Sequence, residues 1–492
     1  MLHRITVERL NRYSNSRQIW CMGCGKRLYE MLDIYEGEPF VDKITALLDN
    51  NKKLWGETKQ ISKKSIAICG TDKLQDIREK NVIILITSDH YEDIYESIYN
   101  VIEEKEVLCY IYPKYYSDIT PFVMKCVSIF PLRRQLLFYA GNEPHENADE
   151  IVTYLEREYK GRKYKVIYLE DSNNNDSPKV YHLNKWTVRK KNSLKEIVKY
   201  ACRYGCSKFL FYENEPIEKA RKEQVLIFLN HGTIPLKKVS DVLKQPGEVD
   251  YAACPGLGCL ELYENQYGID RRKQIYMMPP RVKHMLDCQG KMHELIGEST
   301  SQVIFWLPTF RQLVGSNRKD SKDINPVAIL TSNAEELNAE LKDNNQVLVI
   351  KKHPREKQII KVPKYCENIK ILEEEELLSN NITLQELLKD TDALLTDYSG
   401  IAFEYLLLDR PIGYVISDMD DYFRGFAIDN PTDYMPGMKI SNVKEMKIFF
   451  ENVKNHKDVY SDERKKLINT LFGSNAYENG AQKLIEFIDG IK

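Results

Sequence analysis

Four short segments of the chain carry side chains suited to phosphate chemistry, and each follows an apolar run typical of a buried strand. In the first, FLNHGTIPLKK at residues 228–238, a glycine turn presents His231. Histidine is the side chain best suited to move a proton near neutral pH, and glycine beside it lets a substrate approach the backbone. We predict that His231 is catalytic and that Gly232 and Thr233 bind substrate. An equally weighted alternative is a histidine that caps a helix or bonds a carbonyl.

The second and third segments bring cationic side chains to predicted strand ends. WLPTFR ends in Arg311, whose guanidinium can fork onto two phosphate oxygens, although a surface salt bridge is the commoner role for a single arginine. VIKKHPR gathers Lys352, His353 and Arg355 at one point. Such a density of cationic groups favours a pyrophosphate ligand over a solvated surface.

The fourth segment, ALLTDYSG at residues 393–400, ends an apolar run and opens a predicted helix over residues 401–408. Small and hydroxylated residues at a helix start leave backbone N–H groups free to bind an anion, and the helix dipole adds about 0.3–1 kcal/mol. Ser399 can donate a further hydrogen bond, and Gly400 lies beside it. The alternative is a capped core helix without a ligand.

The elements that must position these segments belong to an α/β fold. Short apolar runs alternate with amphipathic stretches, a pattern that predicts parallel sheets. We expect three units, at residues 1–130, 131–290 and 291–492, with a ligand between the last two because ligands bind at the carboxyl ends of parallel strands. The clearest predicted strands cover residues 18–22, 44–48, 66–69, 82–86, 136–140, 165–169, 208–212, 225–230, 303–307, 346–350, 393–396 and 411–416.

The first unit carries an incomplete dinucleotide fingerprint. A predicted strand leads into Gly23-Cys-Gly25, but Leu28 stands where a third small residue belongs, and Asp49 lies at about the distance of a ribose-binding acid. Because such fingerprints are loose, we predict a small Rossmann-like domain without a bound dinucleotide. A dehydrogenase or dinucleotide sensor is the alternative that rests on these residues.

Bulk composition excludes some classes of protein. The 492 residues are 42% hydrophobic and 29% charged, which is ordinary for globular chains, and the net charge of −2 argues against a protein that coats nucleic acid. Eleven cysteines, an odd number, suggest reduced thiols in the cytosol. Cys21 and Cys24 form a CxxC pair without a partner motif, so we interpret them as structural and expect no metal there.

No segment is predicted to enter a membrane. The N-terminal residues lack the apolar core of a signal peptide, and the longest apolar run, residues 82–86, is far too short to span a bilayer. We therefore expect a cytoplasmic protein, with peripheral contact to the inner face of the membrane left open. A basic stretch at residues 185–199 could make that contact or be a solvated helix face. Its six basic residues are Lys185, Arg189, Lys190, Lys191, Lys195 and Lys199.

The order of the motifs resembles a known family. NHGTIPLKK, WLPTFR, KKHPR, LLTDYSGIAFEYLLLDRP and, as a fifth motif, DYFRGF with the MPG that follows it form a series similar to that of the CDP-glycerol glycerophosphotransferases, which include teichoic acid primases and polymerases. The resemblance covers residues 180–440, and five motifs in the right order are far more specific than any one of them. It implies a GT-B-like pair of Rossmann-like lobes, preceded here by the Rossmann-like N-terminal domain.

The resemblance also implies roles for the matching residues. His231 would be the general base in an acceptor-side lobe at residues 131–290. Arg311, His353 and Ser399 would hold the donor diphosphate in a donor-binding lobe at residues 291–492, and Asp397 would orient a neighbouring base or the helix-start loop.

In the reaction that these roles imply, an acceptor hydroxyl attacks the phosphorus next to the polyol of a CDP-polyol, and CMP leaves. The acceptor would be a polymer or a lipid-linked chain. We expect no cofactor and no structural metal, with a loosely bound Mg²⁺ on the diphosphate left open.

Three departures from the family pattern bear on the identity of donor and acceptor. Asn230 replaces a tryptophan before the histidine, Gly400 follows Ser399 where a second hydroxyl is common, and MMPPRVKH at residues 277–284 lacks the usual acid. The nearest alternative function is a nucleotide-sugar glycosyltransferase on the same frame, and a non-catalytic assembly scaffold is a third class.

Overall fold

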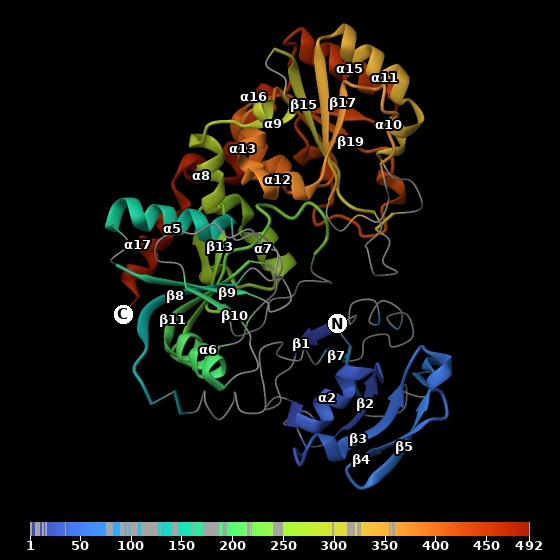
Figure 1. Ribbon diagram of the computed structural model, residues 1–492, viewed down its shortest axis with the longest axis vertical. Helices are drawn as coiled ribbons and strands as arrows, with labels where there is room; N and C mark the ends of the chain where they lie inside the picture. The colour runs from blue at the N-terminus through green and yellow to red at the C-terminus, as the bar shows by residue number, and fades with distance from the viewer. Residues whose placement is uncertain are drawn as a thin grey trace. The chain divides into compact units, whose positions relative to one another are not determined.

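The structure is a computed structural model of the chain (Figure 1). It describes all residues except 1, 5–9, 12–13, 15–16, 35, 75–81, 89–93, 95–97, 99–106, 110–125, 128, 140–145, 161–162, 171–185, 190–193, 214–216, 218, 240–248, 298–299, 312–319, 322–325, 354–355, 357–359 and 492. Two compact units result, one formed by Met1–Phe122 and the other beginning at Val123. Each is considered by itself.

The first unit contains a seven-stranded sheet in the order β1-β7-β6-β2-β3-β5-β4, parallel except for the β4–β5 hairpin. Its strands are β1 (Leu2–Arg4), β2 (Gln18–Met22), β3 (Ile44–Leu48), β4 (Thr58–Ile61), β5 (Lys64–Cys69), β6 (Val82–Ile86) and β7 (Val107–Cys109), and helix α2 (Lys26–Ile34) follows β2. All five residues of β6 are buried, because its apolar run lies inside the sheet. The fold is Rossmann-like, as predicted.

The glycine turn after β2 is held by protein groups. Gly23 has a φ of +97°, a conformation that glycine tolerates best, and the Asp49 carboxylate accepts hydrogen bonds from the backbone N–H groups of Cys24 (2.7 Å) and Asn51 (2.8 Å). Burial raises the pKa of the Cys24 thiol to about 12, which disfavours the thiolate that a metal would need. Asp49 thus has a structural role, and the absence of a dinucleotide stays a prediction.

The second unit contains two further sheets, both entirely parallel. The first of these, in the order β10-β9-β8-β11-β12-β13-β14, defines the N-lobe. Its strands are β8 (Arg133–Tyr139), β9 (Lys165–Glu170), β10 (Trp186–Arg189), β11 (Ser207–Tyr212), β12 (Val225–Phe228), β13 (Tyr251–Cys254) and β14 (Gln274–Tyr276). Its helices are α5 (Glu146–Tyr159), α6 (Leu194–Cys206), α7 (Leu260–Tyr267) and α8 (Pro280–Asp287).

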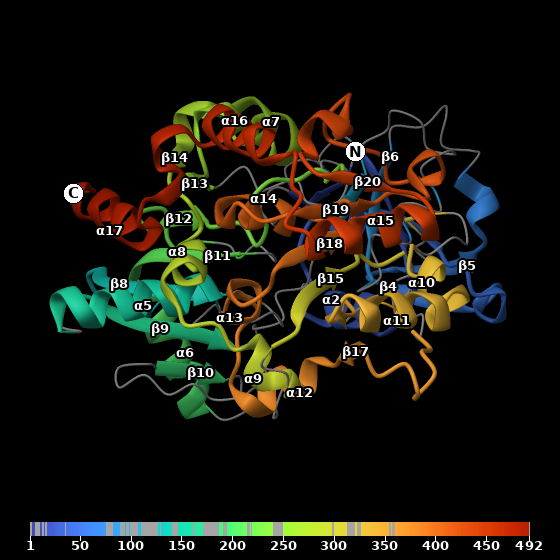
Figure 2. The same cartoon turned by 90° about the horizontal axis from the view of Figure 1, so that it is seen from above.

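The C-lobe has six strands in the order β17-β16-β15-β18-β19-β20, and Figure 2 shows β15, β18 and β19 side by side. The strands are β15 (Gln302–Leu307), β16 (Gln346–Lys351), β17 (Ile369–Leu372), β18 (Ala393–Thr396), β19 (Ile412–Val415) and β20 (Met438–Ile440). The helices after α8 are α9 (Met292–Ile296), α10 (Ala328–Ser332), α11 (Ala334–Asp343), α12 (Glu374–Asn380), α13 (Leu384–Lys389), α14 (Ile401–Tyr405), α15 (Val443–Lys454), α16 (Ser461–Leu471) and α17 (Gly480–Gly490).

The last helix does not belong to the C-lobe, although the unit predicted from the sequence at residues 291–492 includes it. Helix α17 buries Leu484, Ile485 and Ile488 in the core of the N-lobe, and it lies beside α5 in Figure 1. Its start passes so close to the N-lobe that a Cβ at Gly480 would lie 1.9 Å from the Met278 carbonyl oxygen. An amphipathic pattern predicts a helix but does not tell which core its apolar face joins.

Candidate active site

The four segments singled out in the sequence all follow strands of the second unit. The His231 segment follows β12 in the N-lobe. The other three follow β16, β15 and β18, which are neighbours in that order in the C-lobe sheet. Since the carboxyl ends of parallel strands meet at one edge of a sheet, the three C-lobe segments lie together there.

A rigid turn presents His231. Asn230 adopts a φ of +62°, and its side-chain amide donates hydrogen bonds to the hydroxyls of Tyr263 (2.9 Å) and Tyr267 (3.1 Å) while its oxygen accepts one from the Gly232 N–H (3.2 Å). Asparagine tolerates this left-handed conformation better than most residues do, which gives a physical reason for asparagine at this position. The turn is buried up to Asn230, whereas the His231 side chain is exposed.

Thr233 connects the two lobes. It is fully buried, and its hydroxyl donates a 2.6 Å hydrogen bond to the carboxylate of Glu404 in α14, which also pairs with Arg281 at 2.6 Å. In this structure the Thr233 hydroxyl is occupied by its hydrogen bond to Glu404. Direct binding of substrate by Thr233 stays a prediction. Next to it, a Cβ at Gly400 would lie 3.0 Å from the carbonyl oxygen of Ile234, so the turn before α14 packs directly on the His231 turn.

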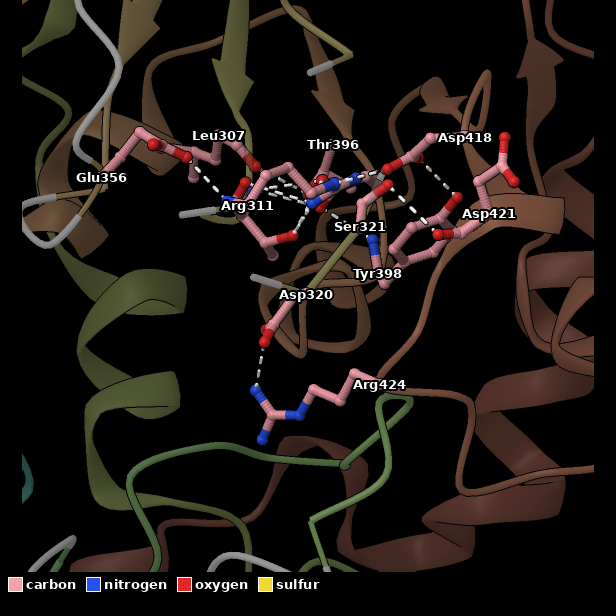
Figure 3. A network of polar contacts seen from close by, with 12 residues as sticks. Leu307, Arg311, Asp320, Ser321, Glu356, Thr396, Tyr398, Asp418, Asp421 and Arg424 are labelled. Carbon is pink, nitrogen blue, oxygen red and sulfur yellow. Dashed lines mark hydrogen bonds and ion pairs between the residues drawn. The ribbon is translucent and has the colours of Figure 1, made fainter. Parts of the chain in front are cut away.

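Arg311 and Asp397 are partners in one buried network. Figure 3 shows the part of this network around Arg311 and Asp418. The Arg311 guanidinium contacts Asp397 at 2.8 Å and Asp418 at 2.6 Å, and all three residues are at most 4% exposed. Asp397 also accepts hydrogen bonds from the N–H (3.1 Å) and hydroxyl (2.8 Å) of Thr309 and from the N–H of Tyr398 (2.7 Å). Burial opposes the arginine's charge, but the two carboxylates outweigh it and raise the pKa of Arg311.

This network ties the end of β15 to the end of β18. The sequence assigned Arg311 to the diphosphate and Asp397 to catalysis separately, and both assignments stay predictions. In the structure the guanidinium nitrogens face protein carboxylates, which is the arrangement expected of residues that position a site.

The remaining C-lobe residues lie around this network. Lys352 and His353 are partly buried, and the His353 ring meets the ring of Phe310 edge to face at a centroid distance of 5.1 Å. The Ser399 hydroxyl accepts a long hydrogen bond of 3.4 Å from the backbone N–H of Ile401 at the start of α14. Arg355 lies outside the described residues.

Two acidic residues of the site escaped the sequence analysis. Asp418 follows the end of β19, so the same rule that found the other segments could have found it. Glu404 lies inside the apolar run FEYLLL, where a carboxylate predicts a buried partner. Nothing in the sequence, however, identifies Arg281 as that partner, because it lies on a helix of the other lobe.

Neither a metal centre nor a membrane span is found in the part of the chain that the structure describes. No three His, Cys, Asp or Glu side chains there come together in a way that could hold an ion. None of the helices described combines the length and the apolar character needed to cross a bilayer. A loosely bound Mg²⁺ on a donor diphosphate stays a prediction.

The two lobes define a protein of the GT-B type, as predicted. The fold resembles that of the wall teichoic acid polymerase TagF, with a TM-score of 0.57 over 82% of this chain and 97% of that one at 18% identity, in a histidine-to-asparagine variant soaked with CDPG. The chain belongs to the family of CDP-glycerol:poly(glycerophosphate) glycerophosphotransferases, which matches residues 123–488. The match begins where the second unit begins, so the Rossmann-like first unit lies outside it.

The curated relatives that match the chain are teichoic acid polymerases and primases. The teichoic acid poly(ribitol-phosphate) polymerase of Bacillus spizizenii is 28% identical over 301 residues, which are 55% of this chain and 46% of that protein. The teichoic acid glycerol-phosphate primase of the same organism is 31% identical over 138 residues, or 28% of this chain and 31% of that one. The chain thus spans about half or less of the length of these two relatives.

Proposed function

We propose that this protein transfers a polyol phosphate, with glycerol phosphate as the first candidate, from a CDP-polyol to a hydroxyl of a cell-envelope polymer of the teichoic acid or capsule type. Family membership supports the class of reaction. One structural observation carries the assignment to this site: the turn that presents His231 packs on the turn at Gly400 that opens α14. The proposed proton acceptor and the proposed diphosphate site therefore meet where the two lobes join.

The proposed reaction is a displacement at phosphorus. The acceptor hydroxyl oxygen forms a bond to the phosphorus that carries the polyol, and the bond from that phosphorus to the oxygen of CMP breaks. His231 takes the hydroxyl proton, and CMP leaves with the bonding electrons. Phosphoryl transfer depends mainly on positioning and charge neutralisation.

The C-lobe would supply that neutralisation. Lys352, His353, Arg355 and the Ser399–Gly400 turn would hold the diphosphate, and the buried pair of Arg311 with Asp397 would fix the strand ends that carry them. Cationic groups held in place before the reaction neutralise charge without a reorganisation cost.

The first prediction concerns the donor. In a screen of nucleotide donors, we expect CMP release from CDP-glycerol or CDP-ribitol to exceed release of nucleoside diphosphate from any UDP- or GDP-sugar. Chromatography of the nucleotide products measures this, with a His231→Ala preparation as the control for contaminating hydrolases. Faster turnover of a nucleotide sugar would instead favour the glycosyltransferase.

We also propose that the protein works at the cytoplasmic face of the membrane, since an acceptor of this type is commonly lipid-linked. The basic stretch at residues 185–199 is the proposed contact, and its six basic side chains lie outside those that the structure describes. Each basic residue near an anionic surface contributes about 1 kcal/mol, so replacing Lys190 and Lys191 by glutamine should weaken binding to phosphatidylglycerol vesicles by roughly 30-fold.

Flotation of the full chain with such vesicles at low salt tests this attachment. The matched control replaces Lys361 and Lys364, two exposed lysines of the C-lobe, by glutamine, and it should float like the unmodified protein. Failure of the unmodified protein to float at low salt would contradict the attachment.

A further inference from the structure

Lys237 is held at the junction of the two lobes by its own backbone. It forms an antiparallel bridge with Phe426 of the C-lobe, and the next residue, Lys238, donates a 3.1 Å backbone hydrogen bond to the Gly425 carbonyl. These contacts join the segment that follows the His231 turn to the C-lobe segment DYFRGF. The backbone position of Lys237 is therefore fixed relative to both lobes.

The amino group of Lys237 has no acceptor within the described part of the chain. The side chain is partly buried, and its Nζ lies 5.9 Å from the centre of the Phe310 ring, the ring that also contacts His353. An anion placed next to this amino group would supply the charged hydrogen-bond acceptor that the described part of the protein does not provide.

The surrounding charges do not compensate Lys237 either. Asp397 is paired with Arg311, and Asp320 with Arg424 at 3.4 Å, so each nearby carboxylate already has an arginine. Burial, and then repulsion by Arg424 and Arg311, outweigh the attraction of Asp397 and Asp320 and lower the pKa of Lys237 to about 7. Near neutral pH, part of the protein therefore carries a neutral amine at this position.

We infer that Lys237 is a ligand of the donor diphosphate and donates a hydrogen bond to one of its non-bridging oxygens. This inference rests on the proposed function. Lys237 belongs to the segment that follows the His231 turn, and its amino group approaches the same Phe310 ring that His353 contacts, which places it beside the proposed diphosphate site. The donor's negative charge would raise the lysine's pKa, and the amine would take up a proton from solvent as the donor binds.

This proton uptake distinguishes Lys237 from an ordinary surface lysine. Each phosphorus of a CDP-polyol carries one ester bond, the shared anhydride bond and a single strongly acidic oxygen, so the diphosphate itself does not titrate near neutral pH. At about pH 8.5, above the lysine's pKa of about 7, binding of CDP-glycerol should take up close to one proton. At about pH 6 the amine is already protonated, so uptake by Lys237 should vanish.

Calorimetry of CDP-glycerol binding to the full chain, in buffers of different ionisation enthalpy, measures both affinity and proton uptake. Lys237→Met should bind about 10- to 100-fold more weakly at about pH 6, where the native lysine is charged, and it should take up no proton at the higher pH. Lys237→Arg keeps a permanent charge, so it should retain affinity within a few-fold but lose the uptake. The exposed neighbour provides the control, Lys238→Met, which should behave like the unmodified protein.

The outcomes separate this inference from the proposed function. If the unmodified protein binds CDP-glycerol but Lys237→Met binds it equally well with the same proton uptake, the inference is wrong and the function stands. If the unmodified protein binds no CDP-polyol, both are wrong. If Lys237→Met does not fold, Lys237→Arg decides alone, because proton uptake that persists in the arginine variant would contradict a role for this lysine.

Discussion

His231→Ala should release CMP from CDP-glycerol about 10²- to 10⁴-fold more slowly than the unmodified protein, with donor affinity nearly unchanged. The imidazole is exposed on a turn that Asn230 and two tyrosines hold in place, so its removal leaves the turn intact. A proton acceptor acts on the acceptor hydroxyl during the reaction and not on the bound donor.

His353→Ala should differ from His231→Ala, because it should lower donor affinity as well as turnover. His353 lies against Phe310 at the end of β16, where the proposed diphosphate contacts persist from the bound state through the reaction. Its loss should therefore weaken CDP-glycerol binding as well as turnover. Calorimetric affinity and CMP release, measured on both variants, separate the two roles.

A third histidine provides the control for these variants. His456 is exposed after α15 and has a φ of +51°, so His456→Asn suits the backbone and should leave affinity and turnover unchanged. Equal loss of donor affinity in His231→Ala and His353→Ala would make His231 a phosphate ligand, and the base would have to be another group.

Arg311→Met should lower the free energy of unfolding by about 3–5 kcal/mol, the usual cost of removing one partner from a buried ion pair. The substitution keeps most of the side-chain volume but leaves Asp397 and Asp418 buried without their cation. Urea denaturation measures the loss. Adding Asp418→Asn to Arg311→Met should recover part of it, because one of the uncompensated charges is then removed.

Arg272→Met is the matched control for this substitution. Its side chain is 89% exposed and pairs with Asp270 at the surface, so urea denaturation should show no resolvable change in stability. A loss in Arg311→Met as small as in this control would contradict the buried network as the element that fixes the strand ends.

The strands of this fold could be predicted because most are continuous apolar runs that end at turn residues. Residues 393–396 and 82–86 were predicted as strands with the bounds that the structure gives them. By contrast, β13 went unpredicted because its sequence, YAAC, lacks a run of large apolar residues, and β20 went unpredicted because three residues are too few to show a pattern.

The site could be predicted only as separate segments. Each of the four was recognisable as a polar cluster after a strand, and family resemblance gave them roles. The pairing of Arg311 with Asp397 could not be predicted, since it requires that β15 and β18 be neighbours in the sheet. The packing of Gly400 on Ile234 could not be predicted either. In a sequence, a glycine that permits close approach of two segments cannot be distinguished from any other turn glycine.

The return of α17 to the N-lobe means that the chain crosses between the lobes twice, once after α8 and once through α16. Helix α16 contacts elements of both lobes, and its buried Arg464 pairs with Asp409 of the C-lobe at 2.9 Å. We expect two connections to restrict relative movement of the lobes more than one would, because rotation about the line that joins them is the motion that strains them least. Such a rotation would preserve the register of the His231 turn against Gly400.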